Sequence, residues 1–177
     1  MQNDTFLRTY DEKRHFLRNI ETRHIREGLL LEHEYLRGVS CLVTQDDNVL
    51  VEMRADAKEG GGLLDFCSGH VDNIELPAHA MIRELDEELG IGFDVAKKLT
   101  KLKEISLVIP RRKIEKNWHM TFYQLELPKN AKLHMQNSEI KSAAMISKND
   151  VLNLYRANQK FLFPHDPSLL QLLSSLR

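Results

Sequence analysis

The stretch GHVDNIELPAHAMIRELDEELGI, residues 69–91, combines an unusual density of acidic residues with regularly spaced apolar ones. Four acidic residues, Glu84, Asp86, Glu87 and Glu88, fall within five positions of it. Like charges three or four residues apart destabilise a helix by roughly 0.2–0.5 kcal/mol per pair. Something must offset this repulsion.

The spacing of this stretch predicts a helix over Pro77–Leu89 with two different faces. At about 100° per residue, one arc collects the apolar side chains of Ala78, Met81, Ile82, Leu85 and Leu89. A neighbouring arc collects Glu84, Glu87 and Glu88, and Asp86 falls outside it. A solvated acidic face would have this pattern. So would a site for Mg²⁺, which prefers carboxylate oxygens and would turn the repulsion into coordination.

The whole stretch also fits a longer pattern with fixed spacings. In G-x5-E-x7-R-E-U-x-E-E-x-G-U, where U is a bulky apolar residue, the fixed positions are Gly69, Glu75, Arg83, Glu84, Leu85, Glu87, Glu88, Gly90 and Ile91. This pattern resembles the signature of the Nudix hydrolases and is far more specific than a lone glycine motif. The resemblance implies an α/β fold, an α/β/α sandwich around a mixed central sheet.

The resemblance extends to both sides of this signature, residues 69–91, which is called the box below. Residues 51–71 are similar to the strand, substrate loop and strand that precede the box in Nudix proteins. Cys67 and Ser68 stand where Pro-Gly usually leads into the glycine, which is a departure from the family. Residues 139–147 resemble a Glu-x5-apolar-x-Ser segment of the MutT-like bacterial enzymes that sanitise oxidised nucleotides.

The remaining segments predict a single mixed domain with an extension. Apolar residues at roughly helical spacing predict a helix over residues 4–27, so we expect a helical N-terminal extension (1–33) ahead of a Nudix domain (34–177). Residues 36–44 and 49–54 give a hairpin signal. Further strands are predicted at 63–67, 101–109, 118–127 and 139–146, a basic loop at 110–117, and helices capped by Ser147 and Asp166.

Composition excludes several classes of function. The net charge of -1 provides no positive field that would attract nucleic acid, so no nucleic-acid partner is expected. The apolar runs are too short to span a membrane, and the charged N-terminus is unlike a signal peptide. Only two cysteines occur, Cys41 and Cys67, which suits a reducing compartment. We expect a cytoplasmic protein and leave a homodimer open.

The resemblance implies hydrolysis of a pyrophosphate linkage in a nucleoside diphosphate bonded to another group X, with Mg²⁺ or Mn²⁺ as cofactor. Such an ion neutralises phosphate charge and acidifies a bound water. By match to the box, the implied metal ligands are Glu84, Glu87 and Glu88, with the backbone carbonyl of Ser68 added. Glu84 is alternatively the base that orients the water.

The other box residues have supporting roles by the same match. Arg83 is expected to orient the glutamates through charge-assisted hydrogen bonds and so to serve catalysis. Glu75 is expected to fasten the loop to the helix. Gly69 and Gly90 are expected to be structural, supplying a loop conformation and a helix end.

Three residues outside the box are further candidates. Glu139 matches the fourth carboxylate that many family members take from a later loop, and we expect it to be a catalytic base. Glu115 is the second candidate for that role. Arg54 ends the strand before the glycine-rich loop, where related enzymes contact phosphate or base, and is expected to bind substrate.

Two other functions of the same fold need to be distinguished. Isopentenyl diphosphate isomerases are similar in fold but require a cysteine directly before the loop glycine, where this chain has Ser68. Cys67 is one residue early, and the strand pleat would turn it the other way. Non-catalytic nucleotide-sensing domains lose box glutamates, which this chain keeps. A metal-dependent turnover assay separates the three functions.

Overall fold

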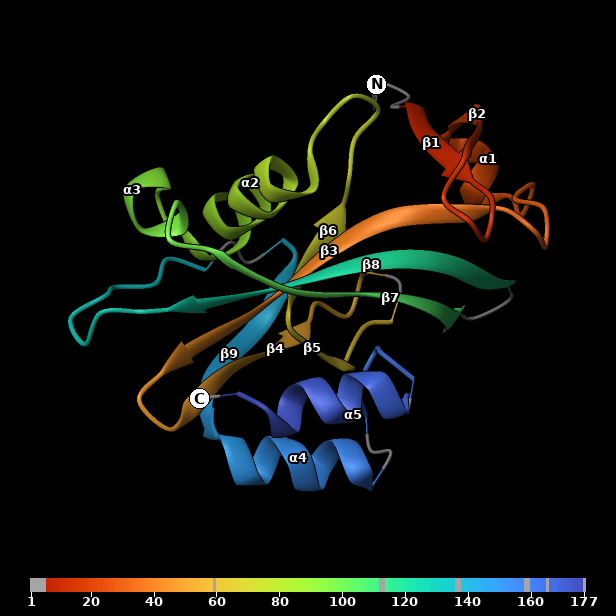
Figure 1. Cartoon of the computed structure of the whole chain (residues 1–177). Helices are drawn as coiled ribbons and strands as arrows, with labels where there is room; N and C mark the ends of the chain where they lie inside the picture. The colour runs from red at the N-terminus through yellow and green to blue at the C-terminus, as the bar shows by residue number, and fades with distance from the viewer. Residues whose placement is uncertain are drawn as a thin grey trace.

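A mixed β-sheet, covered by helices on both faces, forms the centre of the computed structural model (Figure 1). The structure describes residues 6–58, 60–111, 114–135, 138–157, 160–164 and 166–176, without the side chains of 110, 111, 114 and 115. Helices α2 and α3 lie on one face of the sheet and α4 and α5 on the other. The expected α/β class with a mixed central sheet is therefore confirmed.

The strands are arranged around β3. In chain order they are β1 (Phe6–Tyr10), β2 (Phe16–Glu21), β3 (Tyr35–Gln45), β4 (Asn48–Arg54), β5 (Leu64–Asp65), β6 (Cys67–His70), β7 (Thr100–Arg111), β8 (Ile114–Glu126) and β9 (Ile140–Ser147). β3 pairs in parallel with β8 and antiparallel with β4 and β6. β7 extends the sheet beyond β8, and β9 and β5 flank β4. The predicted β3–β4 hairpin is confirmed.

The helices are α1 (Thr22–Arg26), α2 (Pro77–Leu89), α3 (Phe93–Ala96), α4 (Lys148–Arg156) and α5 (Pro167–Ser174). Helices α4 and α5 begin directly after the predicted capping residues, Ser147 and Asp166. The side chain of Ser147 accepts a hydrogen bond from the backbone N–H of Asp150 at the start of α4. Asp166 does the same for α5. Gly90 ends α2 in the left-handed conformation, with φ of 65°. Among the helices of the described residues, none is long and apolar enough to cross a membrane.

The start of the chain differs from the predicted helix over residues 4–27. β1 and β2 pair as an antiparallel hairpin, and Tyr10 of β1 pairs with Tyr35 of β3, which joins the hairpin to the central sheet. Only α1 is helical, so the helical extension predicted for residues 1–33 was wrong for the described residues 6–21. The division of the chain after residue 33 stays a prediction.

Local hydrogen bonds and cross-strand packing explain this difference. The Asp11 carboxylate accepts a hydrogen bond of 2.8 Å from the backbone N–H of His15, which competes with helical bonding. Arg14 between them has a φ of 71°, so the chain turns here. Leu7 and Ile20 stand opposite each other across the hairpin and are both buried. Apolar residues with a roughly helical spacing thus pack in a β-hairpin instead of a helix.

The basic loop predicted at residues 110–117 is also largely absent. β7 and β8 continue through most of this segment, and Arg111 pairs with Ile114 across the turn. Arg112 and Lys113 lie outside the described residues. The strands extend this far because β-branched residues such as Ile109 and Ile114 flank the basic residues, and these suit a strand.

Glu34 fastens the N-terminal hairpin to the sheet. Its carboxylate accepts hydrogen bonds from Thr9 Oγ1 at 3.0 Å, from Arg18 Nε at 2.6 Å and Nη2 at 2.8 Å, and from the backbone N–H of Leu31 at 2.9 Å. Its side chain is only 2% exposed. The hydrogen bonds from Arg18 are the largest influence, and they lower the pKa of Glu34 to about 2.

We expect Glu34→Gln to lower the free energy of unfolding at pH 7 by about 2 kcal/mol, the usual worth of charge-assisted hydrogen bonds. Because the folded-state pKa lies below the ordinary value of 4.5, the contribution is present above that pH and is lost as pH falls toward 2. Urea unfolding at about pH 7 and about pH 3 measures both effects. The exposed Glu32→Gln is the matched control, and equal losses in both variants would contradict the assignment.

Candidate active site

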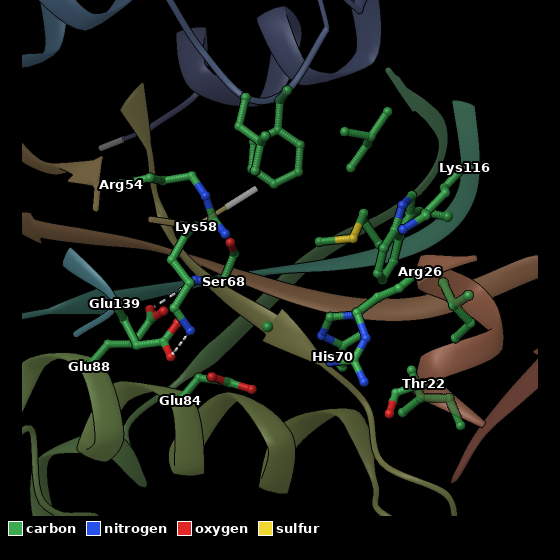
Figure 2. A pocket seen from close by; sticks show the side chains of 18 residues that line it. Thr22, Arg26, Arg54, Lys58, Ser68, His70, Glu84, Glu88, Lys116 and Glu139 are labelled. Atoms are coloured by element: carbon green, nitrogen blue, oxygen red, sulfur yellow. Dashed lines mark hydrogen bonds and ion pairs between the residues drawn. The ribbon is translucent and has the colours of Figure 1, made fainter. Parts of the chain in front are cut away.

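A cavity of about 520 Å³ lies along β8 and is bounded by α2 at one end and α1 at the other (Figure 2). It is lined by Leu7, Thr22, Ile25, Arg26, Arg54, Lys58, Ser68, Gly69, His70, Glu84, Glu88, Ile109, Lys116, Trp118, Met120, Glu139, Leu162 and Phe163. Segments far apart in the sequence therefore share one site. Several of the residues that the sequence singled out meet here.

α2 directs Glu84 and Glu88 into this cavity (Figure 2). The Glu84 side chain is 13% exposed and Glu88 is 7% exposed. Burial raises the pKa of Glu84 to about 7 and that of Glu88 to about 8, because carboxylates lose hydration here. Two such carboxylates four residues apart on one helix face repel each other. A hard divalent cation would offset both costs, so these oxygen donors fit Mg²⁺ or Mn²⁺.

Glu87 is placed differently from its two neighbours. Its side chain is 55% exposed, pairs with Arg83 at 3.2 Å, and does not line the cavity. Glu84 and Glu88 are four residues apart and lie on the same face of α2, whereas Glu87 is turned toward solvent. The structure thus brings together two of the three glutamates implied as metal ligands, and ligation by Glu87 stays a prediction. Asp86 is exposed and outside the cavity, as expected from its position outside the acidic arc of the helix.

Arg83 links the box loop to the helix. Its guanidinium donates to Glu84 Oε1 at 2.8 Å, to Glu75 Oε1 and Oε2 at 3.3 and 3.1 Å, and to the carbonyl oxygen of His70 at 3.0 Å. Glu75 also accepts a hydrogen bond from the backbone N–H of Asp72. These charge-assisted bonds hold the Glu84 carboxylate in one orientation. These contacts suit the orienting role predicted for Arg83 and the loop-fastening role predicted for Glu75, and both roles stay predictions.

Gly69 allows the closest approach in the site. A Cβ at this position would lie 2.0 Å from the Glu84 carboxyl group, so any larger residue would displace this carboxylate from its observed position. The neighbouring Ser68 donates a backbone hydrogen bond of 3.3 Å to Glu88 Oε2. Because the N–H and C=O of one strand residue point to the same side, the Ser68 carbonyl points out from the same edge of β6 as this N–H. This supports the carbonyl as a ligand, which stays a prediction.

Arg54 reaches the cavity from the end of β4 (Figure 2). Its Nη1 donates to Asp65 Oδ2 at 2.9 Å, and Asp65 is 1% exposed. The guanidinium therefore neutralises a buried carboxylate while lining the cavity. Substrate binding by Arg54 stays a prediction that this position supports.

Two buried acids behind the cavity escaped the sequence reasoning. Glu52, Cys67 and Glu88 each place one potential ligand atom within 4.8 Å of the others. Burial, and then the charge of Glu88, raises the pKa of Glu52 well above its ordinary value. Its Oε1 has no hydrogen-bond partner among the described residues. Together with Asp65, this surplus of buried carboxyl groups again favours a nearby cation. The sequence did contain a signal for these two residues, because Glu52 and Asp65 are each an acidic residue inside an otherwise apolar strand segment.

Glu139 lies at the cavity edge, at the start of β9, and forms an ion pair with Lys58 of the glycine-rich loop (Figure 2). The sequence reasoning missed Lys58. The backbone N–H of Ala55 donates to the Glu139 carbonyl at 3.0 Å, which holds the loop beside β9. The side chain of Glu115, the second candidate base, lies outside the described residues.

The two residues before Gly69 face opposite ways. Ser68 lines the cavity, whereas Cys67 is 2% exposed and packs in the apolar cluster beneath α2. The alternation of strand side chains keeps Cys67 out of the cavity lining, as predicted, although its thiol lies within 4.8 Å of a Glu88 carboxylate oxygen. The cysteine that an isomerase of this fold requires is therefore missing from the lining.

Comparison with known proteins gives a consistent picture. The model of the NUDIX domain family matches residues 34–166. A CTP pyrophosphohydrolase of Escherichia coli (strain K12) is 36% identical over 53 residues, which are 30% of this chain and 39% of that protein. The match thus spans well under half of that curated relative.

Solved structures match over much more of the chain. The DR0079 protein of Deinococcus radiodurans has a TM-score of 0.72 at 17% identity, covering 96% of this chain and 97% of that one. A bifunctional NMN adenylyltransferase/ADP ribose pyrophosphatase of Francisella tularensis, complexed with AMP and a manganese ion, has a TM-score of 0.61 at 23% identity. It covers 86% of this chain and 45% of that one. At these identities the structural matches establish the fold.

Proposed function

Since the chain belongs to the Nudix domain family, we propose that it hydrolyses a pyrophosphate linkage in a nucleoside diphosphate bonded to another group X, using Mg²⁺ or Mn²⁺. One observation carries this proposal. Two buried carboxylates, Glu84 and Glu88, share a cavity with the cationic side chains of Arg54 and Lys58. Cationic side chains can bind the negatively charged pyrophosphate, and carboxylates can bind the divalent ion that neutralises it.

Different residues of the cavity have different roles in the proposed reaction. Glu84, Glu88 and the Ser68 carbonyl would hold the divalent ion. When bound, such an ion neutralises charge on the phosphate oxygens and acidifies a coordinated water. Arg83 keeps Glu84 oriented through its hydrogen bond of 2.8 Å. Arg54 and Lys58 bind phosphate oxygens.

Glu139 is proposed as the group that takes the proton of the attacking water. A base functions best when it is free of the metal and within hydrogen-bond reach of the water. Glu139 lies in the turn just before β9 rather than on α2, and in the structure it forms an ion pair with Lys58. An incoming phosphate would compete for Lys58 and so release Glu139.

The substrate class is nucleotides, including nucleoside triphosphates. The E. coli relative is named for CTP and the F. tularensis protein for ADP-ribose, which are both nucleoside pyrophosphate compounds. An isomerase function has less support because Cys67 lies outside the cavity. A nucleotide sensor without catalysis has less support because Glu84 and Glu88 are both retained and both face the cavity.

We expect turnover of at least one compound in a panel of nucleoside triphosphates, nucleotide sugars, dinucleotides and capped RNA ends, with Mg²⁺ or Mn²⁺ present. Products identified by chromatography should be a nucleotide and a phosphorylated X, and a chelator should abolish their formation. The physical reason is that hydrolysis of an anionic linkage needs the metal charge. Absence of turnover across the panel with either metal would contradict the enzymatic function.

A further inference from the structure

The cavity is longer than a pyrophosphate group requires. Ser68 and Phe122 both stand opposite Ser40 of β3, so they lie at the same level of the sheet. Lys116 lines the cavity six residues before Phe122 on β8, and Trp118 lines it between them. At 3.3 Å per strand residue, the cavity extends about 20 Å from the Ser68 level. Most of the substrate must therefore lie beyond the carboxylate end.

The N-terminal segment closes this far end. Leu7 of β1 and Ile25 of α1 line the cavity, and they are only 3% and 4% exposed. Phe163 and Trp118 line it as well, which makes the middle of the cavity apolar and aromatic. Such surfaces stack and enclose a nucleobase. The hairpin that Glu34 fastens to the sheet is thus a wall of the cavity.

Arg26 stands out within this wall. It is an exposed residue at the last position of α1, and its side chain reaches into the cavity toward His70 (Figure 2). Among the described residues it forms no hydrogen bond or ion pair. A guanidinium presents a planar fork of donors that matches the oxygens of a phosphate. Its position therefore indicates a ligand rather than a structural contact.

Cationic side chains lie at both ends of the cavity, and only one end also holds carboxylates. In Figure 2, Arg54 and Lys58 lie on the side of Glu84, Glu88 and Glu139, whereas Arg26 and Lys116 lie on the opposite side. Lys116 is itself 6% exposed, so its ammonium group is held close to the apolar lining. A ligand with an anionic group only at the carboxylate end would make no charged contact with Arg26.

We propose that Arg26, with Lys116, binds a second phosphate group of the substrate, carried on the nucleoside at the end away from the cleaved linkage. The inference rests on the proposed function for the direction in which the substrate lies. The pyrophosphate then occupies the Glu84–Glu88 end, the base and ribose lie along the aromatic middle, and a phosphate on the ribose meets Arg26. The substrate class is a nucleoside diphosphate derivative with an additional 2′- or 3′-phosphate.

Calorimetry without metal tests this proposal, because it needs no reaction. The probes are the four nucleoside 5′-monophosphates and the corresponding 2′,5′- and 3′,5′-bisphosphates. We expect at least one bisphosphate to bind about tenfold more tightly than its monophosphate, as one charge-assisted contact provides. Arg26→Gln should reduce this ratio to about one. Arg23→Gln, one turn away on the same helix and outside the cavity lining, should keep it.

The outcomes separate this inference from the proposed function. Equal affinities for both probe classes in the unmodified protein would overturn the phosphate subsite, even if the protein hydrolyses nucleotides. An equal loss of affinity for both classes in Arg26→Gln would overturn it too. A preserved bisphosphate preference with no turnover of any nucleotide would support the subsite and contradict hydrolysis. Thermal unfolding of both variants checks that the exposed substitutions leave the fold unchanged.

Discussion

Replacing Glu88 by glutamine is expected to lower kcat by at least about two orders of magnitude while leaving the protein folded. The side chain keeps its size, and the Ser68 backbone N–H, 3.3 Å from Glu88 Oε2, can still donate to an amide oxygen. What disappears is the charge of a carboxylate that faces the cavity beside Glu84. The measurement is kcat with saturating Mn²⁺, together with a thermal unfolding curve of the metal-free protein.

Two neighbouring substitutions make this result specific. Asp86→Asn changes an equally acidic residue of the same helix that is exposed and outside the cavity, and it should be nearly silent. If it impaired kcat as strongly as Glu88→Gln, the assignment of helix faces would be wrong. The box implies a comparable loss for Glu87→Gln. A small effect would instead leave Glu87 as a partner of Arg83, with which it pairs at 3.2 Å.

The predictable parts of the fold are those that local sequence determines. α2 has the predicted limits because Pro77 opens it and Gly90, in the left-handed conformation, closes it. The Ser147 cap depends only on contacts within a few residues. The N-terminal hairpin was missed in part because its connection to the sheet, where Tyr10 pairs with Tyr35 of β3, lies outside any local sequence window. Short apolar patterns fit a helix or a hairpin equally well.

In the candidate site, too, the residues that could be predicted are those whose positions follow from local sequence. Glu84 and Glu88 followed from the spacing of one helix, since residues four apart share a face. Lys58 and Arg26 did not, because a loop and a remote helix bring them to the cavity only after folding. Glu52 and Asp65 were overlooked inside apolar strand segments, although an acid in such a segment is itself unusual. Isolated charges in apolar strands are therefore worth flagging before a structure exists.

Glu139→Gln is expected to lower kcat by roughly ten- to a thousandfold with little change in KM, the usual worth of a positioned base. The Glu139 side chain is 42% exposed at the cavity edge, so it can move over a bound substrate once its contact with Lys58 is broken. Glu126→Gln removes an exposed carboxylate at the end of β8, outside the cavity lining, and should leave kcat unchanged.

Glu84 is the competing base, and the two assignments predict opposite pairs of results. A base that is free of the metal can be removed without loss of metal affinity, whereas a ligand cannot. If Glu139 is the base, Glu139→Gln retains Mn²⁺ binding by calorimetry and loses the acidic limb of the pH–rate profile, and Glu84→Gln weakens Mn²⁺ binding. If Glu139→Gln keeps both the acidic limb and the kcat of the unmodified protein, Glu84 is the base that takes the proton of the attacking water. The hydrogen bond of 2.8 Å from Arg83 would then orient the base itself rather than a ligand.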